Sequence, residues 1–193
     1  MTPISAALYA PLVAIQAGTY RLGPDHGTLS VRTKRGGAAA KAGHNLLLHV
    51  TSWEATLEVG ANASDSTFEL GADGGSLRVV EGTGGMQALG DDDKENIEQT
   101  IDEEVLKQQR ITFQSSQVQA TAGGTGLNVR GDLTLLGATH PIAFDVEVDE
   151  AGKLSCVAVI TQSEWGIKPY SALFGALKVL DEVEVALDGK VET

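Results

Sequence analysis

Residues 131–154 read GDLTLLGATHPIAFDVEVDEAGKL, and their apolar side chains recur at every second position. The residues of this apolar alternation are Leu133, Leu135, Ile142, Phe144, Val146 and Val148. A period of two is typical of β-strands with one apolar face and one polar face. Residues 137–141, which include a glycine and a proline, indicate a hairpin turn between the two runs. The apolar face must be covered by a second sheet, by a helix or by a bound hydrophobic molecule, and the function depends on which.

The same alternation recurs along most of the chain and predicts an all-β domain of eight or more antiparallel strands. The further runs that follow this template are residues 28–33, 45–50, 53–59, 66–70, 76–81, 111–118, 125–136, 153–161 and 179–191. Residues 125–136 form a run of 12 residues, which spans roughly 40 Å at about 3.3 Å per residue. That length favours a tall barrel, and closing a sheet into a barrel also removes its exposed edges.

One segment departs from the period of two. In residues 91–107, DDDKENIEQTIDEEVLK, the apolar residues Ile97, Ile101 and Val105 are spaced by four, which predicts one surface α-helix. The three aspartates at its start suit a helix N-terminus and the positive end of the helix dipole. They lack the glycine and the distal glutamate of a calcium-binding EF-hand loop, so we expect no metal site there.

Composition restricts the partners. The chain of 193 residues carries a net charge of −12, which disfavours nucleic acid as a partner and binding to anionic membranes by charge alone. Cys156 is the only cysteine, so no intrachain disulfide can form. The apolar residues 4–15 are too short for a membrane span and have no Lys or Arg before them, so we expect no stable membrane insertion and a cytoplasmic location. We take residues 1–17 as an N-terminal extension that docks on the domain.

Catalytic motifs are absent from the sequence: it contains no nucleophile elbow, phosphate loop, dinucleotide fingerprint or zinc-protease motif. The histidines show no metal-binding spacing, since His44 and His49 are five apart and would face opposite sides of a strand. We therefore expect a protein that is not an enzyme, with no catalytic or metal-binding residues and no cofactor. An enzyme that acts on a hydrophobic substrate inside the barrel, with His44, His49 or Glu54 near the chemistry, remains an alternative.

Alternation, with two aromatic residues of the irregular segment 163–174, gives a set of apolar side chains expected to line a ligand site. They are Leu29, Val31, Leu46, Leu48, Trp53, Leu57, Phe113, Leu133, Leu135, Phe144, Val146, Trp165 and Phe174. A shift of one residue in register would turn any strand's set outward. The chain has many Ala, Val and Leu but few aromatic residues, which favours a hollow interior over a filled one.

Several segments together resemble the YceI-like family of lipocalin-fold proteins. The hairpin of residues 131–148 is similar to a family strand ending G-x-L-T-x-x-G that is followed by T-x-P and an alternating strand. Further segments that resemble the family are residues 19–26, 110–115, 164–167 and 181–185. Two segments depart from the family pattern: residues 34–43 form a Gly/Ala loop, and residues 104–107 replace a family helix motif.

The resemblance covers roughly residues 18 to 192, and we take residues 18–193 as one YceI-like β-barrel domain. It implies an elongated eight-stranded antiparallel barrel that holds an amphipathic polyisoprenoid, such as a quinone or a prenyl chain. A long apolar tunnel would stabilise such a chain by about 0.8 kcal/mol for each buried CH2 group. A small hydrophobic ligand is then the expected partner, and a homodimer is compatible with the sequence. An alternative to a ligand carrier is a protein whose barrel core is filled by its own side chains and that acts in stress response or assembly.

Overall fold

The computed structural model describes residues 16–122, 126–149 and 151–190. The predicted extension, residues 1–17, lies almost wholly outside these residues. The strands are β1 (Gly18–Leu22), β2 (Gly27–Thr33), β3 (Arg35–Gly36), β4 (His44–Val50), β5 (Trp53–Val59), β6 (Thr67–Asp73), β7 (Leu77–Gly84), β8 (Arg110–Ala120), β9 (Gly126–Leu135), β10 (Ala138–Val148), β11 (Lys153–Thr161), β12 (Ser171–Ala172), β13 (Leu177–Val179) and β14 (Glu182–Lys190). The helical elements are α1 (Asp91–Thr100), a π-helical turn η4 (Ile101–Val105), and 3-10 turns η1 (Ala40–Ala42), η2 (Ala63–Asp65), η3 (Gly74–Ser76), η5 (Gln162–Trp165) and η6 (Leu173–Gly175).

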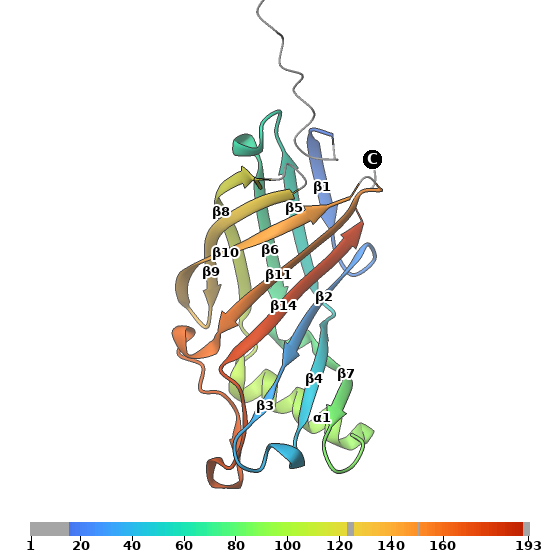
Figure 1. Cartoon of the computed structure of the whole chain (residues 1–193), viewed down its shortest axis with the longest axis vertical. Coiled ribbons are helices and arrows are strands. Elements are labelled where there is room, and N and C mark those ends of the chain that lie inside the picture. The colour runs from blue at the N-terminus through green and yellow to red at the C-terminus, as the bar shows by residue number, and fades with distance from the viewer. Residues whose placement is uncertain (1–15, 123–125, 150, 191–193) are drawn as a thin grey trace, which may run out of the picture.

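Eleven strands form one strongly curled antiparallel sheet, a half-barrel, in the order β1-β5-β6-β8-β9-β10-β11-β14-β2-β4-β7 (Figure 1). The predicted antiparallel all-β class is confirmed, but the predicted count of eight strands is not. The count is higher because β1 and β2, β4 and β5, and β6 and β7 are separate strands, each pair divided by a short break. The breaks fall at residues 23–26 between β1 and β2, at Thr51 and Ser52 between β4 and β5, and at η3 between β6 and β7. Pairing with neighbours continues on both sides of each break, as in β1–β5 and β2–β4.

The β9–β10 hairpin is tighter than the sequence suggests. Its turn consists of Leu136 and Gly137 alone, both with positive φ (52° and 78°), the backbone of a two-residue turn whose twist matches the flanking strands. Ala138 already pairs with Leu135, so His140 and Pro141, which we expected in the turn, belong to β10. The predicted alternation within both strands is unaffected.

The predicted surface helix is present but changes its winding midway. Gly90 is its N-cap residue, and its N–H donates to the Asp93 carboxylate at 3.1 Å. After Thr100 the helix widens into the π-helical turn η4, in which the Leu106 N–H donates to the Ile101 carbonyl oxygen at 2.8 Å. The wider turn brings Leu106, five residues on, to the same side as Ile101, toward the sheet.

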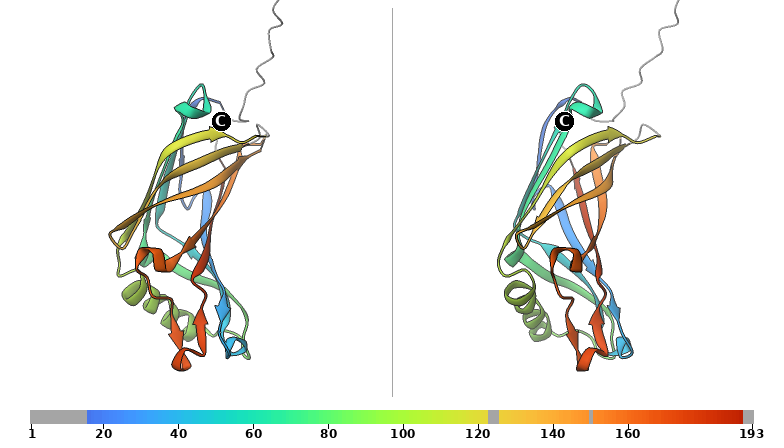
Figure 2. Two further views of the ribbon diagram at one scale, coloured as in Figure 1. Left: turned by 60° about the vertical axis from the view of Figure 1, so that its left-hand side comes forward. Right: turned by 90° about the vertical axis from the view of Figure 1, so that its left-hand side faces the viewer.

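A second, small sheet, β12-β13-β3, lies at the lower end of the molecule (Figures 1 and 2). Backbone hydrogen bonds join its two segments: the Ala39 N–H donates to the Ala176 carbonyl oxygen, and the Leu180 N–H donates to the Lys34 carbonyl oxygen. Leu173 and Phe174 both have positive φ (52° and 54°), which is uncommon for bulky residues. In the described part of the chain, no helix is long and apolar enough to cross a membrane.

Candidate functional site

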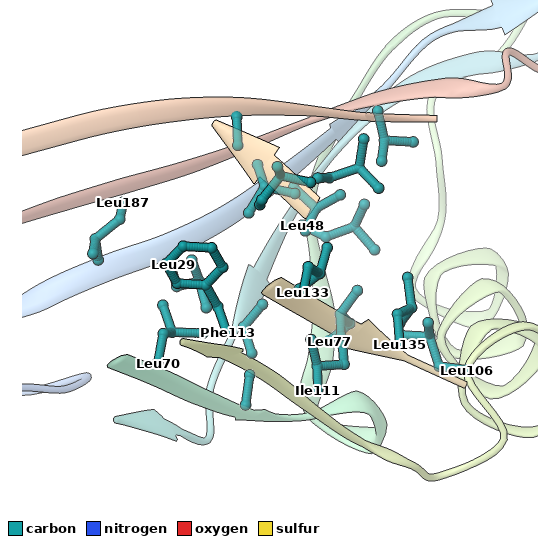
Figure 3. Close-up of a pocket in the computed structure, with 18 of the residues that line it drawn as sticks. Leu29, Leu48, Leu70, Leu77, Leu106, Ile111, Phe113, Leu133, Leu135 and Leu187 are labelled. Atoms are coloured by element: carbon teal, nitrogen blue, oxygen red, sulfur yellow. The ribbon is translucent and has the colours of Figure 1, made fainter. Parts of the chain in front are cut away.

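The curled sheet encloses an apolar cavity of about 210 Å³ in its lower half, beside η4 (Figure 3). Its lining residues come from nearly every strand of the main sheet and from the helical segment. They are Leu29, Val31, Thr33, Leu48, Val50, Phe68, Leu70, Ala72, Leu77, Ile101, Val105, Leu106, Ile111, Phe113, Leu133, Leu135, Ile142, Phe144, Cys156, Ala158, Ile160, Gln162, Ile167, Val183, Val185 and Leu187. Only three of these side chains carry a polar atom, so the cavity is suited to a hydrocarbon.

Three phenylalanines form the inner end of the cavity. The ring centroids of Phe68, Phe113 and Phe144 lie 6.0, 6.2 and 5.3 Å apart in pairs, the tilted and edge-on distances that aromatic pairs prefer. Gly131 makes room for this cluster, because a Cβ there would lie 2.6 Å from the Phe113 ring and 2.3 Å from the Gln114 carbonyl oxygen. We call these three residues the phenylalanine floor.

Beyond the phenylalanine floor the interior is solid. Along β9, Leu133 and Leu135 line the cavity, whereas Leu127 and Val129 are fully buried and do not. Along β10 the change falls between Phe144, which lines the cavity, and Val146, which is 2% exposed and does not. One continuous apolar face therefore serves two purposes: half of it packs as an ordinary core and half borders the cavity.

The few polar groups at the cavity differ in whether they have a hydrogen-bond partner. The Thr33 hydroxyl is buried without a hydrogen-bond partner in the described part of the chain, and Gln162 donates to the Leu180 carbonyl oxygen at 3.0 Å. Burial raises the pKa of the Cys156 thiol to about 11, since the thiolate would lose its hydration in these surroundings. The thiol is therefore neutral at physiological pH and acts as a small apolar side chain.

Helix residues complete the wall, and the site prediction missed them. Ile101, Val105 and Leu106 close the side of the cavity that the sheet leaves open. The spacing of Ile97, Ile101 and Val105 by four residues gave the signal, because an apolar stripe on a charged helix must cover something. The alternation of Val183, Val185 and Leu187 in β14 could likewise have identified these three lining residues.

Seven of the thirteen residues predicted from alternation border the cavity. They are Leu29, Val31, Leu48, Phe113, Leu133, Leu135 and Phe144. The other six, which do not border this cavity, are Leu46, Trp53, Leu57, Val146, Trp165 and Phe174. Trp53, Leu57 and Val146 are buried in the hydrophobic core without bordering the cavity, although Trp53 pairs with the lining residue Ala72. Leu46 packs on the core beside the bulge in the β4–β7 pairing.

The two aromatic residues predicted from the irregular segment also miss the cavity. Trp165 is buried at its rim, where its Nε1–H donates to the Leu133 carbonyl oxygen at 3.0 Å and its ring meets His140 edge-on at 5.2 Å. Phe174 is 112% exposed, because η6 holds it at the lower tip of the molecule. Alternation does not indicate an inward face in such turns, so it does not predict where these two side chains lie.

The residues of the enzyme alternative are scattered. His44 Nε2 lies 2.7 Å from the Gln87 carbonyl oxygen, Glu54 pairs with Arg110 at 2.6 Å on the surface, and neither these residues nor His49 borders the cavity. Within residues 16–122, 126–149 and 151–190, no three His, Cys, Asp or Glu side chains cluster as a metal would require.

A curled antiparallel β-sheet around an apolar cavity defines the broad class of β-barrel-like proteins with an internal ligand space. Within that class, the chain belongs to the YceI-like family: the family model described as "YceI-like domain" matches residues 20–191. No curated protein matches the chain.

Solved structures of three other proteins are similar in fold. BcnA of Burkholderia cenocepacia is 19% identical with a TM-score of 0.62, over 86% of this chain and 96% of that one. A mutant YceI protein of Campylobacter jejuni, solved with monobromobimane as guest, is 13% identical with a TM-score of 0.54, over 76% and 84%. A polyisoprenoid binding domain from Saccharophagus degradans is 9% identical with a TM-score of 0.51, over 92% and 100%. At these identities the likeness shows the fold alone.

Proposed function

We propose that this protein binds and carries an amphipathic polyisoprenoid or a similar lipid, without chemical conversion, in the cavity above η4. The observation that carries the proposal is the lining: twenty-three of its twenty-six side chains are hydrocarbon only. Apolar cavities in which water finds no hydrogen-bond partners stay dry and take up apolar guests. A polyisoprenoid binding domain among the proteins of similar fold supports the same ligand class.

The size of the cavity restricts what it can hold. A volume of about 210 Å³ corresponds to about seven groups of the size of a water molecule, at ~30 Å³ each. A ligand that fills it with about seven CH2-sized groups would gain roughly 6 kcal/mol of transfer free energy before the costs of binding. The cavity thus suits one or two five-carbon isoprene units, and a longer chain would extend past the lining or displace the phenylalanine floor.

The polar end of such a ligand has few places to go inside the cavity. The Thr33 hydroxyl and the Gln162 side chain are the polar groups that combine a position on the lining with hydrogen-bonding capacity. Both precede segments that lead to the small sheet at the lower end of the molecule. We place the ligand headgroup at these two residues, with the hydrocarbon chain directed to the phenylalanine floor.

Native mass spectrometry of the freshly purified chain, followed by organic extraction, tests the proposal. We expect a non-covalent adduct of lipid mass that is released on extraction, or uptake of added prenols by the extracted protein. The matched variants Ala158→Phe and Ala143→Phe add the same ring, to the cavity lining and to the exposed outer face of β10. Uptake should be lost in the first variant and kept in the second. An adduct-free protein that takes up no prenol, or two variants that behave alike, would exclude the carrier function.

A further inference from the structure

The cations of this acidic chain are concentrated at one end of the molecule. Residues 34–43 and 166–180, which we call the basic tip, contain five of the fourteen Lys and Arg residues and none of the twenty-six Asp and Glu residues. These two segments form the small sheet β12-β13-β3 with the turns η1 and η6. In Figures 1 and 2 the basic tip projects below α1, at the lower end of the molecule beside the end of β7. The tip segments therefore carry a formal charge of +5 within a chain of −12, with Glu164, Asp181 and Glu182 flanking them.

The ammonium groups of the basic tip are available to a partner. Lys41, Lys168 and Lys178 are exposed, and within the described part of the chain none of them forms an ion pair. Lys34, by contrast, pairs with Glu184 at 2.6 Å, and this hydrogen bond and charge contact raise the pKa of the lysine and lower that of the carboxyl group. Lys34 thus belongs to the junction with the barrel, and three unpaired lysines remain at the end.

Large apolar side chains are exposed between these lysines. Phe174 is 112% exposed, Leu173 58% and Tyr170 50%. The positive φ angles of Leu173 and Phe174 hold this pair outward at a conformational cost. Exposed apolar groups with a polar rim mark contact sites for membranes or proteins.

We propose that the basic tip docks on the surface of an anionic lipid bilayer, with Leu173 and Phe174 inserted among the lipids and Lys41, Lys168 and Lys178 at the headgroups. Aromatic and aliphatic side chains beside lysines are the combination that holds peripheral segments at a membrane interface. The acidic residues of α1, and Asp181 and Glu182 beside the tip, weaken the attraction, but their repulsion is largely screened beyond about 8 Å at physiological salt. Thr33, Gln162 and Ile167, at the base of the basic tip, also line the cavity, so docking would bring the cavity to the membrane. The docking proposal does not depend on what the cavity holds.

Co-sedimentation of the full chain with vesicles tests this proposal. The vesicles are phosphatidylcholine, alone or with about a third of phosphatidylglycerol. We expect binding to the anionic vesicles only, weakened by added salt. The double variant Lys168→Gln/Lys178→Gln should lower the partition coefficient about 30-fold, and Leu173→Ser/Phe174→Ser at least about tenfold.

Matched controls lie at other surfaces of the same barrel. Lys153 and Lys190 form an exposed pair of cations at one end of β11 and β14, and Val157 and Val159 are 54% and 56% exposed on β11. Lys153→Gln/Lys190→Gln and Val157→Ser/Val159→Ser should change the partition coefficient by less than about twofold, because these residues lie outside the basic tip. The proposal is overturned if the wild-type chain ignores anionic vesicles or if the controls weaken binding as much as the tip variants do. It is also overturned if the tip variants abolish self-association, measured by sedimentation velocity, while vesicle binding persists; the basic tip would then be a contact between copies.

Discussion

The phenylalanine floor should set the length of the chain that the cavity accepts, and Phe144→Ala tests this directly. Phe144 lies where β10 passes from cavity lining to solid core, and its ring contacts those of Phe68 and Phe113. Removing its six ring carbons frees room for about one further isoprene unit of five carbons, because protein interiors pack like organic solids. The preferred ligand should therefore become longer by one unit.

The magnitudes follow from burial. Phe→Ala substitutions in cores cost about 3–5 kcal/mol, and we expect about 3 for Phe144 because one side of its ring already faces the cavity. For a chain of this size that loss lowers Tm by roughly 6–12 °C. Five additional buried carbons offer up to about 4 kcal/mol of transfer free energy. After the costs of ordering the chain, we expect the longer prenol to bind at least about tenfold more tightly to the variant than to the wild type.

The assay is displacement of a fluorescent apolar probe by prenols of two, three and four isoprene units, with Tm measured in parallel. Val146→Ala is the matched control, since Val146 lies two residues further along β10 and is buried without bordering the cavity. It should lose stability while keeping the wild-type order of affinities. The reasoning is refuted if Phe144→Ala keeps the wild-type length preference, or if the wild type binds all three prenols equally well.

Three further predictions concern single residues. Because the pKa of Cys156 is raised from 9.0 to about 11 in the folded chain, the unfolded chain releases the thiol proton at lower pH. The free energy of unfolding should therefore fall as the pH rises from about 9 to about 11. In urea denaturation across this range, the wild type should lose roughly 2–3 kcal/mol more than Cys156→Ala. Gly131→Ala should lower the free energy of unfolding by about 2 kcal/mol or more in chemical denaturation, because the new Cβ would lie 2.3 Å from the Gln114 carbonyl oxygen. Gly90→Ala is the control and should cost less, since its Cβ would meet only the Asp93 carboxylate, at 3.6 Å. Trp165→Phe should lower the free energy of unfolding by about 1–3 kcal/mol, because the hydrogen bond to the Leu133 carbonyl oxygen is lost. The same variant should lose the change in tryptophan fluorescence on ligand uptake, whereas Trp53→Phe should retain it. Equal fluorescence responses in both variants would contradict the rim position of Trp165.

Alternation predicted most of the sheet because a half-buried strand leaves its period in the sequence. Residues 53–59 match β5, and the runs at 28–33 and 111–118 match β2 and β8 to within two residues. The separate runs at 45–50 and 53–59 match the break at Thr51 and Ser52, and those at 66–70 and 76–81 match the break at η3. The π-helical turn was beyond the sequence pattern, because Ile101 and Val105 fit an α-helix equally well.

The site was harder to predict than the fold because alternation tells inward from outward but not hollow from solid. Leu133 and Val146 look alike in the pattern, yet the first borders the cavity and the second is in the packed core. What separates them is their height along the barrel, which depends on the stagger between distant strands. Phe174 illustrates a second difficulty: it is an aromatic residue in an irregular segment, where no alternating face indicates burial, and it is exposed.

The scarcity of aromatic residues explains how one sheet can be solid at one end and hollow at the other. Of the four phenylalanines in the chain, Phe68, Phe113 and Phe144 meet at one level and Phe174 lies at the outer tip. Above the floor, Leu and Val side chains such as Leu127, Val129 and Val146 fill the interior. Below it, the wall is lined by aliphatic side chains, with Thr33, Cys156 and Gln162 as the polar exceptions, and no aromatic ring reaches across the centre. The cavity is thus a consequence of where the large rings are placed, and a single added ring at Ala158 should close it.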